Sequence, residues 1–192
     1  MEDVGGTPGS VTGRRSGQGL YPYRVRGRRR SGTVLWRPGL RDGEPDEVFA
    51  VPHGNAAGDT AGDGGGAGWR VPVFTTGRQP GPYTRRHGLR LVTAEANVLE
   101  LVRAERWLAD PVRRAVPAGD VLGAWNFFED LARGLRTVDA LPSQGAVHDS
   151  AYDKLFGDEC DEWTPAERAC VLELLTAGTA LWNTCPVVVR PR

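Results

Sequence analysis

Residues 120–135, "DVLGAWNFFEDLARGL", decide the fold, because they form the clearest helical pattern in the 192-residue chain. Their apolar side chains recur at i, i+3, i+4 and i+7, which is the spacing of one buried helix face. The apolar set is Val121, Ala124, Trp125, Phe128, Leu131, Ala132 and Leu135. We expect Asp120 to cap the N-terminus of this helix.

The same period of 3.6 appears before this segment, beyond residue 93. Its apolar members are Val98, Leu101, Val102 and Trp107–Leu108. They predict a helix that ends near Asp110–Pro111, because proline disfavours helical backbone at the residue before it.

The last helix is predicted by "TPAERACVLELLTAGTALW" at residues 164–182. Thr164 can cap it, Pro165 suits the first turn, and Glu167 completes a capping box. The buried stripe comprises Val171, Leu174, Leu175, Leu181 and Trp182, and Pro186 ends the helix. Between the two long helices, "SAYDKLF" predicts a short helix that places Tyr152, Leu155 and Phe156 on the core.

The first half of the chain carries short runs rich in β-branched and aromatic residues. These are "TVLWR" at 33–37, "EVFAVP" at 47–52, "WRVPVFTT" at 69–76 and "LRLVT" at 89–93. They predict a small antiparallel sheet of three or four short strands. The Gly-rich segment 53–68 separates the second and third runs, so we expect a hairpin with a long loop there. Pro72 argues for an edge position of its strand.

These patterns predict an α+β fold with one domain over residues 33–189. Residues 33–93 supply mainly strands, and residues 94–186 supply mainly helices. Residues 1–32 contain few apolar side chains and many Gly, Ser and Arg. Ordering them would cost more conformational entropy than their burial returns, so we expect a disordered, basic, Arg/Gly-rich arm.

Charge is unevenly distributed along a chain whose formal net charge is zero. Residues 1–30 carry +5, and residues 118–192 carry −6. The densest charge run is Asp158, Glu159, Asp161 and Glu162, ahead of the last helix, where the helix dipole favours negative charge. A structural explanation therefore exists, but the run also suits a basic partner. We expect a non-catalytic interaction or regulatory module that presents this acidic face, as small immunity or antitoxin proteins do at the level of charge.

A second hypothesis is nucleic-acid binding through two groups of arginines. The arm carries Arg28, Arg29 and Arg30 near Tyr21 and Tyr23, and basic side chains with aromatic rings are what contacts to RNA or DNA use. Arg85 and Arg86 belong to a second basic segment at 78–90, which we expect to be a loop that can contact phosphates.

A third hypothesis is a metal-dependent hydrolase or transferase that uses His148 with Asp149 or Asp153. Imidazole and carboxylate groups are metal ligands, but these offsets do not share a helical face in the i, i+4 manner. We therefore predict no metal site and no cofactor, and we name no catalytic residue. "GDGGGA" at 62–67 precedes a strand rather than a helix, which does not suit a dinucleotide site.

The cellular location is predicted from three negative observations. Cys160, Cys170 and Cys185 show no metal-ligand spacing and are odd in number, which favours free thiols. Arg28–Arg30 are followed by Arg37 and Pro38, where an export signal needs an unbroken apolar segment. No apolar run reaches membrane-spanning length. We expect a cytoplasmic protein, of bacterial origin given the GC-rich residue bias, with no membrane partner; no family resemblance is apparent.

Overall fold

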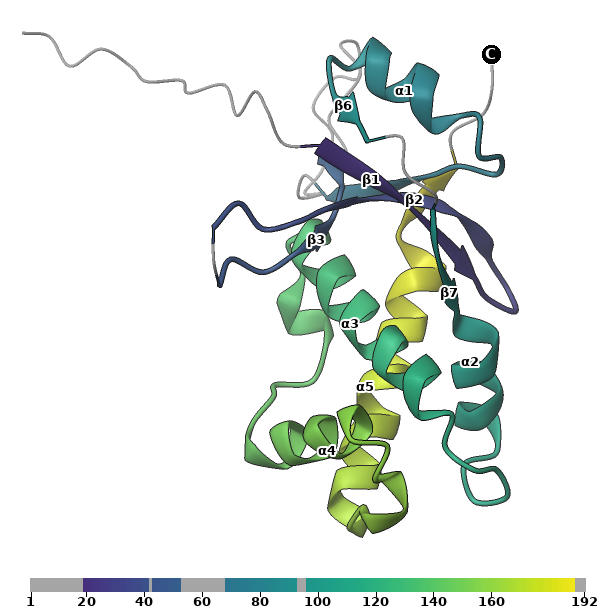
Figure 1. The fold of residues 1–192 in the computed structure, drawn as a ribbon, viewed down its shortest axis with the longest axis vertical. Coiled ribbons are helices and arrows are strands. Elements are labelled where there is room, and N and C mark those ends of the chain that lie inside the picture. The colour runs from purple at the N-terminus through teal and green to yellow at the C-terminus, as the bar shows by residue number, and fades with distance from the viewer. Residues whose placement is uncertain (1–18, 42, 53–67, 93–95, 189–192) are drawn as a thin grey trace, which may run out of the picture.

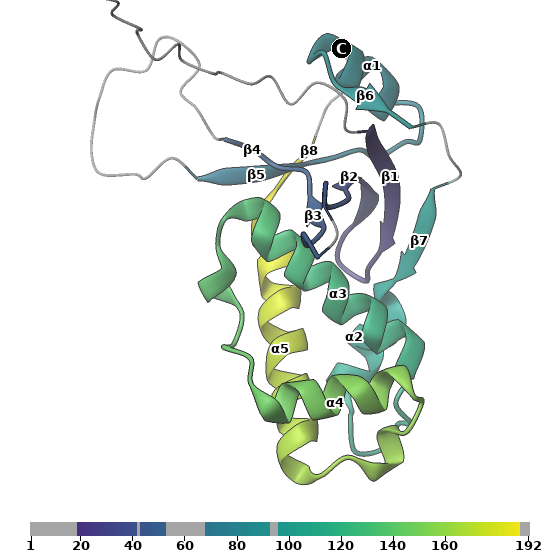
Figure 2. The same ribbon diagram turned by 60° about the vertical axis from the view of Figure 1, so that its left-hand side comes forward.

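The computed structural model describes residues 19–41, 43–52, 68–92 and 96–188, and over these ranges the chain is a mixed α+β protein. The strands are β1 (Gly19–Arg26), β2 (Ser31–Arg37), β3 (Glu47–Val48), β4 (Val51–Pro52), β5 (Trp69–Val73), β6 (Arg90–Leu91), β7 (Asn97–Glu100) and β8 (Pro186–Val188). The α-helices are α1 (Pro80–Arg86), α2 (Leu101–Ala109), α3 (Ala118–Leu135), α4 (Ala146–Phe156) and α5 (Pro165–Thr184). The helix α1 covers one side of the strands and α2 to α5 lie on the other (Figures 1 and 2).

The sheets are mixed rather than antiparallel, so that part of the fold prediction is wrong. One sheet has the order β3-β2-β1-β6, with β7 also pairing with β1, and the other has the order β4-β5-β8. β1 pairs antiparallel with β2 but parallel with β6 and β7, and β5 pairs parallel with β8. The parallel pairs arise because β6, β7 and β8 return to the strands after helical or long connections. The predicted pairing of 47–52 with 69–76 is confirmed in part, because β4 pairs with β5 whereas β3 pairs with β2.

The predicted C-terminal boundary of the disordered arm, residue 32, is wrong. Residues 19–32 form β1, the turn after it and the start of β2. β1 buries Leu20 and Val25 on opposite sides, which the low apolar content of 1–32 as a whole concealed. Pro22 is tolerated because β6 pairs with residues 19–20 and β7 with residues 23–26, so Pro22 falls between the two ladders. The predictions for residues 1–18 and for the Gly-rich loop 53–67 lie outside the described residues.

Side chains alternate between the two faces of the strands, and this alternation separates two hydrophobic cores. Val25 and Val34 point to the side of α2 to α5 and join a large core with the residues of those helices. Leu20 and Leu35 point to the other side and form a small core with Phe49 and Phe74, on which Tyr83 of α1 packs. The strands therefore separate a deep helical layer from a thin layer made by α1.

The helical patterns are confirmed, with shifted ends. All seven predicted apolar residues of α3 are buried, as is the predicted stripe of α5, and α5 has the Thr164–Glu167 capping box. α3 begins at Ala118, so Asp120 lies in the first turn and does not cap the helix. α2 starts at Leu101, because Asn97–Glu100 pair with β1 as β7.

Two further predictions about helices are corrected by the structure. The segment 78–90 contains helix α1 rather than only a loop, since Pro80 begins the helix and the ring of Tyr83 anchors it. In α4, Leu155 is buried and Tyr152 is half-buried, but Phe156 is 78 % exposed. Phe156 is the last residue of α4.

Candidate functional site

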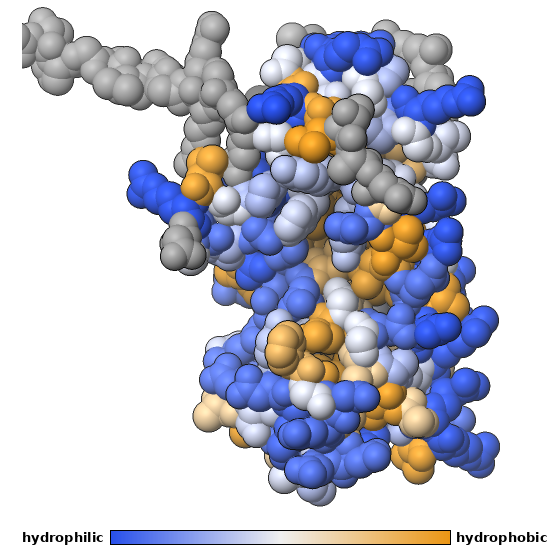
Figure 3. Space-filling view, in the orientation of Figure 1, coloured by the Kyte–Doolittle hydropathy of each residue, from blue (hydrophilic) through white to orange (hydrophobic). Residues whose placement is uncertain are grey.

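Asp158, Glu159, Asp161 and Glu162, here called the acidic surface, lie between α4 and α5 at one tip of the molecule. In Figure 1 this turn is the lower end, and Figure 3 shows hydrophilic residues dominating that end of the same face. All four residues are exposed, and none forms an ion pair with another residue in the described ranges. The structure therefore brings the predicted acidic residues together with their carboxylates available to solvent.

The acidic surface is held by a network of hydrogen bonds around Glu167. The Glu167 carboxylate accepts from the Ser150 hydroxyl at 2.6 Å, from the Thr164 backbone N–H at 2.6 Å and from Lys154 at 3.0 Å. These bonds lower the pKa of Glu167 to about 2, with the Ser150 bond as the largest cause. Lys154 also donates to the carbonyl of Glu162 at 3.0 Å. The chain's single lysine is thus engaged beneath the acidic surface and fixes its backbone.

Two aromatic side chains flank this turn: Trp163 is buried and anchors it, and Phe156 is exposed. Trp163 is buried, donates its indole N–H to the carbonyl of Ala151 at 3.2 Å and lies under the guanidinium of Arg168 at 5.8 Å. Phe156 stands two residues before Asp158 with most of its ring in solvent. Aromatic side chains are enriched where protein partners bind, and exposed charges around them steer a partner of opposite charge.

The arginines Arg28, Arg29 and Arg30 lie in the turn between β1 and β2, and one of their side chains, that of Arg30, is engaged within the fold. Arg30 donates to the carbonyl of Trp182 at 3.0 Å, and its guanidinium lies 6.0 Å from the indole ring. Arg28 donates its backbone N–H to Glu105 at 2.6 Å, whereas its side chain and that of Arg29 are exposed. Arg28, Arg29 and Arg30 therefore belong to a structured turn against α2 and α5, and the prediction that they lie on a free arm is wrong.

Arg85 and Arg86 do not lie together with Arg28, Arg29 and Arg30. They are exposed in the last turn of α1, where the helix dipole favours positive charge. α1 lies on the side of the strands opposite α2 and α5, as Figure 1 shows. The neighbouring ring of Tyr83 packs edge-on against Phe74 at 5.2 Å, and burial raises its pKa, so this ring serves the small core.

His148, Asp149 and Asp153 lie on α4 without forming a metal centre. His148 packs edge-on against Trp125 at 6.1 Å, and its Nε2 is buried without a hydrogen-bond partner among the described residues. Within the same ranges, no group of three or more His, Cys, Asp or Glu side chains is placed to hold a metal ion. Burial raises the pKa of the Cys160 and Cys170 thiols, which disfavours the nucleophilic thiolate.

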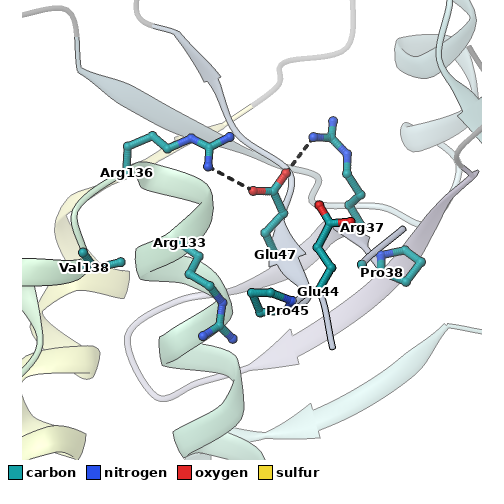
Figure 4. A pocket seen from close by; sticks show the side chains of 9 residues that line it. Arg37, Pro38, Glu44, Pro45, Glu47, Arg133, Arg136 and Val138 are labelled. Atoms are coloured by element: carbon teal, nitrogen blue, oxygen red, sulfur yellow. Dashed lines mark hydrogen bonds and ion pairs between the residues drawn. The ribbon is translucent and has the colours of Figure 1, made fainter. Parts of the chain in front are cut away.

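A cleft of about 500 Å³ between β2, β3 and the end of α3 contains several charged residues (Figure 4). Glu47 accepts from Arg37 at 2.7 Å and pairs with Arg136 at 3.5 Å. Arg37 also lies over the ring of Phe49, and Arg136 lies over the ring of Trp69. These arginines are engaged by acidic and aromatic residues of the chain, so the cleft is best explained as a structural link between sheet and helix.

A second cleft, of about 410 Å³, lies between the helical side of the sheet and helices α3 and α4. We call it the Asp130 cleft, and its lining comprises Tyr23, Trp36, Pro45, Asp46, Asn97, Asn126, Phe127, Asp130, Arg133 and Tyr152. Sequence reasoning missed it, although a signal existed. Asn126, Asp130 and Arg133 recur at i, i+4 and i+7, which places three polar side chains on one face of the most apolar helix.

Asp130 is a hydrogen-bonded carboxylate of this cleft. Its carboxylate accepts from the indole N–H of Trp36 at 3.0 Å and from Arg133 three residues later. Burial nevertheless raises the pKa of Asp130 above its usual value, and the negative charge of Asp46 adds to that rise. Tyr23 stacks over Phe127 at 6.4 Å, and burial followed by the charge of Asp130 raises the pKa of Tyr23.

Comparison of the chain with protein-family models, curated proteins and solved structures finds no match. None of the helices in the described ranges combines the length and apolar character needed to cross a lipid bilayer. Function must therefore be argued from the surfaces and clefts of the molecule itself.

Proposed function

We propose that this protein is a non-catalytic interaction module that binds a basic protein partner through the acidic surface and Phe156. The observation that carries the proposal is the arrangement at one tip: four exposed carboxylates, outside the ion pairs of the described residues, beside an aromatic ring that is 78 % exposed. The negative charges would speed the encounter with a basic partner, and the ring would supply apolar contact area.

The anchoring of this tip supports the proposal further. A surface that is already held in one conformation loses less entropy on binding than a loose loop does. Here the Thr164–Glu167 capping box, the Lys154 bonds and the buried Trp163 fix the backbone on which the acidic residues stand. We infer a regulatory or inhibitory role of the kind that small immunity and antitoxin proteins perform by covering a basic surface.

The charge part of the proposal is tested with the variant D158N/E159Q/D161N/E162Q. The wild type and this variant are immobilised, and nuclease-treated native lysate is passed over both, with bound proteins quantified by mass spectrometry. We expect basic proteins retained by the wild type to fall at least about tenfold on the variant at low salt, since steering by exposed charges is lost. The double variant D161N/E162Q is also compared with D139N/E173Q, which neutralises two exposed carboxylates elsewhere and so makes the same change of net charge. We expect only D161N/E162Q to lose captured partner.

The aromatic part is tested separately with Phe156→Ser. The matched control is Val138→Ser, because Val138 is an exposed apolar side chain, 58 % exposed, at the cleft between β2, β3 and the end of α3. We expect Phe156→Ser to weaken binding of the captured partner by raising its dissociation rate, and we expect the control variant to bind as the wild type. Unchanged binding by both the Phe156 and the acidic variants would overturn the proposal. Capture that occurs only from lysate without nuclease treatment, and that is lost when Arg85 and Arg86 are replaced, would instead favour nucleic-acid binding.

A further inference from the structure

The Asp130 cleft is separate from the acidic surface and combines charge with aromatic walls. It contains the carboxylates of Asp46 and Asp130 against the single guanidinium of Arg133. Arg133 is itself occupied, since it donates to the backbone carbonyl of Asp46 at 2.9 Å, pairs with Asp130 and lies 3.5 Å from Glu129. The charged side chains of the cleft therefore leave an excess of negative charge.

The aromatic rings that line the cleft come from three different elements. Tyr23 of β1 and Trp36 of β2 lie on the helical side of the sheet, and Tyr152 of α4 lines the same cleft. All three are half-buried, so part of each ring borders the cleft. Aromatic faces attract organic cations, and the attraction strengthens where water is partly excluded.

Hydrogen-bonding groups with spare capacity complete the site. Tyr152 donates its hydroxyl to the side-chain oxygen of Asn126 at 3.0 Å, which leaves the hydroxyl oxygen as an acceptor. Asp46 accepts from the backbone N–H of Gly39 at 2.8 Å through one oxygen only, so its second oxygen can accept from a ligand. These acceptors suit the several N–H donors of a guanidinium or ammonium group.

We propose that the Asp130 cleft binds the cationic head of an alkylguanidinium or alkylammonium group between the rings of Tyr23, Trp36 and Tyr152. The carboxylates supply the charge, the rings supply the walls, and the volume of about 410 Å³ exceeds what one such head group needs. Burial raises the pKa of Asp130 despite its bonds to Arg133 and Trp36, so a cation bound beside it would stabilise its charged form. The inference does not depend on the proposed function, since the acidic surface contributes no residue to the cleft.

The test uses the full chain with butylguanidinium as the probe and butylurea as its neutral isostere. Binding is followed by NMR at the indole N–H groups of the six tryptophans. We expect the Trp36 signal to shift most, because its N–H bonds to Asp130, and we expect butylurea to bind at least about tenfold more weakly. Equal binding of the two probes, or shifts spread evenly over the six signals, would overturn the proposal.

Two variants locate the site, and a third controls for net charge. D130N removes the central negative charge, and Y152L removes one wall; we expect about tenfold and several-fold weaker binding of butylguanidinium respectively. E173Q makes the same charge change on an exposed residue of α5 and is expected to bind as the wild type. If thermal unfolding shows that D130N does not fold, the affinity of Y152L for butylguanidinium still tests the site. Wild-type affinity in every folded variant would refute the site.

A final pair of probes distinguishes the two sources of such a cation. Agmatine represents a free small molecule, and the capped peptide Gly-Gly-Arg-Gly-Gly represents an arginine side chain of a protein. Tighter binding of agmatine points to a metabolite, and tighter binding of the peptide points to a partner protein. Glucose is included as a neutral polyol, and preferential binding of glucose over both cations would contradict the proposal.

Discussion

The two layers that cover the strands differ in the amount of apolar surface they bury, and this difference determines which parts of the protein are most stable. On one side, α2 to α5 bury Trp107, Trp125 and Trp182 almost completely. On the other side, the short helix α1 covers a core built on Leu20, Leu35, Phe49 and Phe74. Because burial of apolar area supplies most of the folding free energy, we infer that the helical side sets global stability, whereas α1 opens locally.

The largest expected effect is on the helical side. Leu174→Ala removes a side chain of α5 that is 0 % exposed, and we expect it to lower the free energy of unfolding by about 2–5 kcal/mol. Urea denaturation measures the change. Leu172→Ala, at a half-buried position of the same helix, is the control and should cost clearly less. Equal costs for the two substitutions would contradict the burial of α5 described above.

A smaller and local effect is expected on the side of α1. Tyr83→Ala removes the ring that packs at 5.2 Å against Phe74, and we expect a loss of about 1–2 kcal/mol. Hydrogen exchange should show faster exchange of the α1 amides while the α5 amides keep their protection. Arg86→Ala, at an exposed position of the same helix, is the control. Comparable loss of protection in α5 would show that the two sides unfold together.

The smallest effect concerns pH and again separates the two sides. The pKa of Glu167 is lowered from 4.5 to about 2, so its carboxylate stabilises the fold above pH 4.5, and that contribution is lost as the pH falls towards 2. In this window we expect the first turn of α5 to lose amide protection in the wild type. α1 contains no acidic residue and should not change by this cause.

Glu167→Gln isolates this pH effect. The variant should be less stable than the wild type above pH 4.5, and the difference should shrink as the pH falls through the window. Asp130 acts with the opposite sign, because its raised pKa favours protonation in the folded state, but it is common to both proteins and cancels in the difference. A constant difference between the two proteins from pH 5 to about 2 would contradict the role of Glu167.

Glycines show why the deep side packs as closely as it does. A Cβ at Gly134 would overlap the carbonyl oxygen of Val48, and a Cβ at Gly178 would overlap the ring of Phe128. The absence of a side chain at these positions lets α3 approach β3 and lets α5 approach α3. Neither requirement shows in the sequence pattern, where both glycines interrupt good helical segments.

The candidate sites were predictable to different degrees. The acidic surface could be predicted from composition, because its four residues are close in sequence and precede a recognisable helix start. The exposure of Phe156 could not, since the i, i+4 pattern of α4 pairs it with Tyr152 and assigns it to the core, whereas its ring is 78 % exposed at the end of the helix. The Asp130 cleft joins residues from 23 to 152, and no local pattern connects β1, β2, α3 and α4.

The sequence by itself determined the helices α3 and α5, the capping box at Thr164 and the strand at 33–37. These features depend on interactions within a few turns or on a local hydrophobic period, and both are present whatever the rest of the chain does. Only the tertiary structure decided that β1 joins the sheet, that β6, β7 and β8 pair in parallel, and that Arg30 packs on Trp182. Such pairings join residues far apart in sequence, and their free energy appears only when the chain has closed the intervening loops.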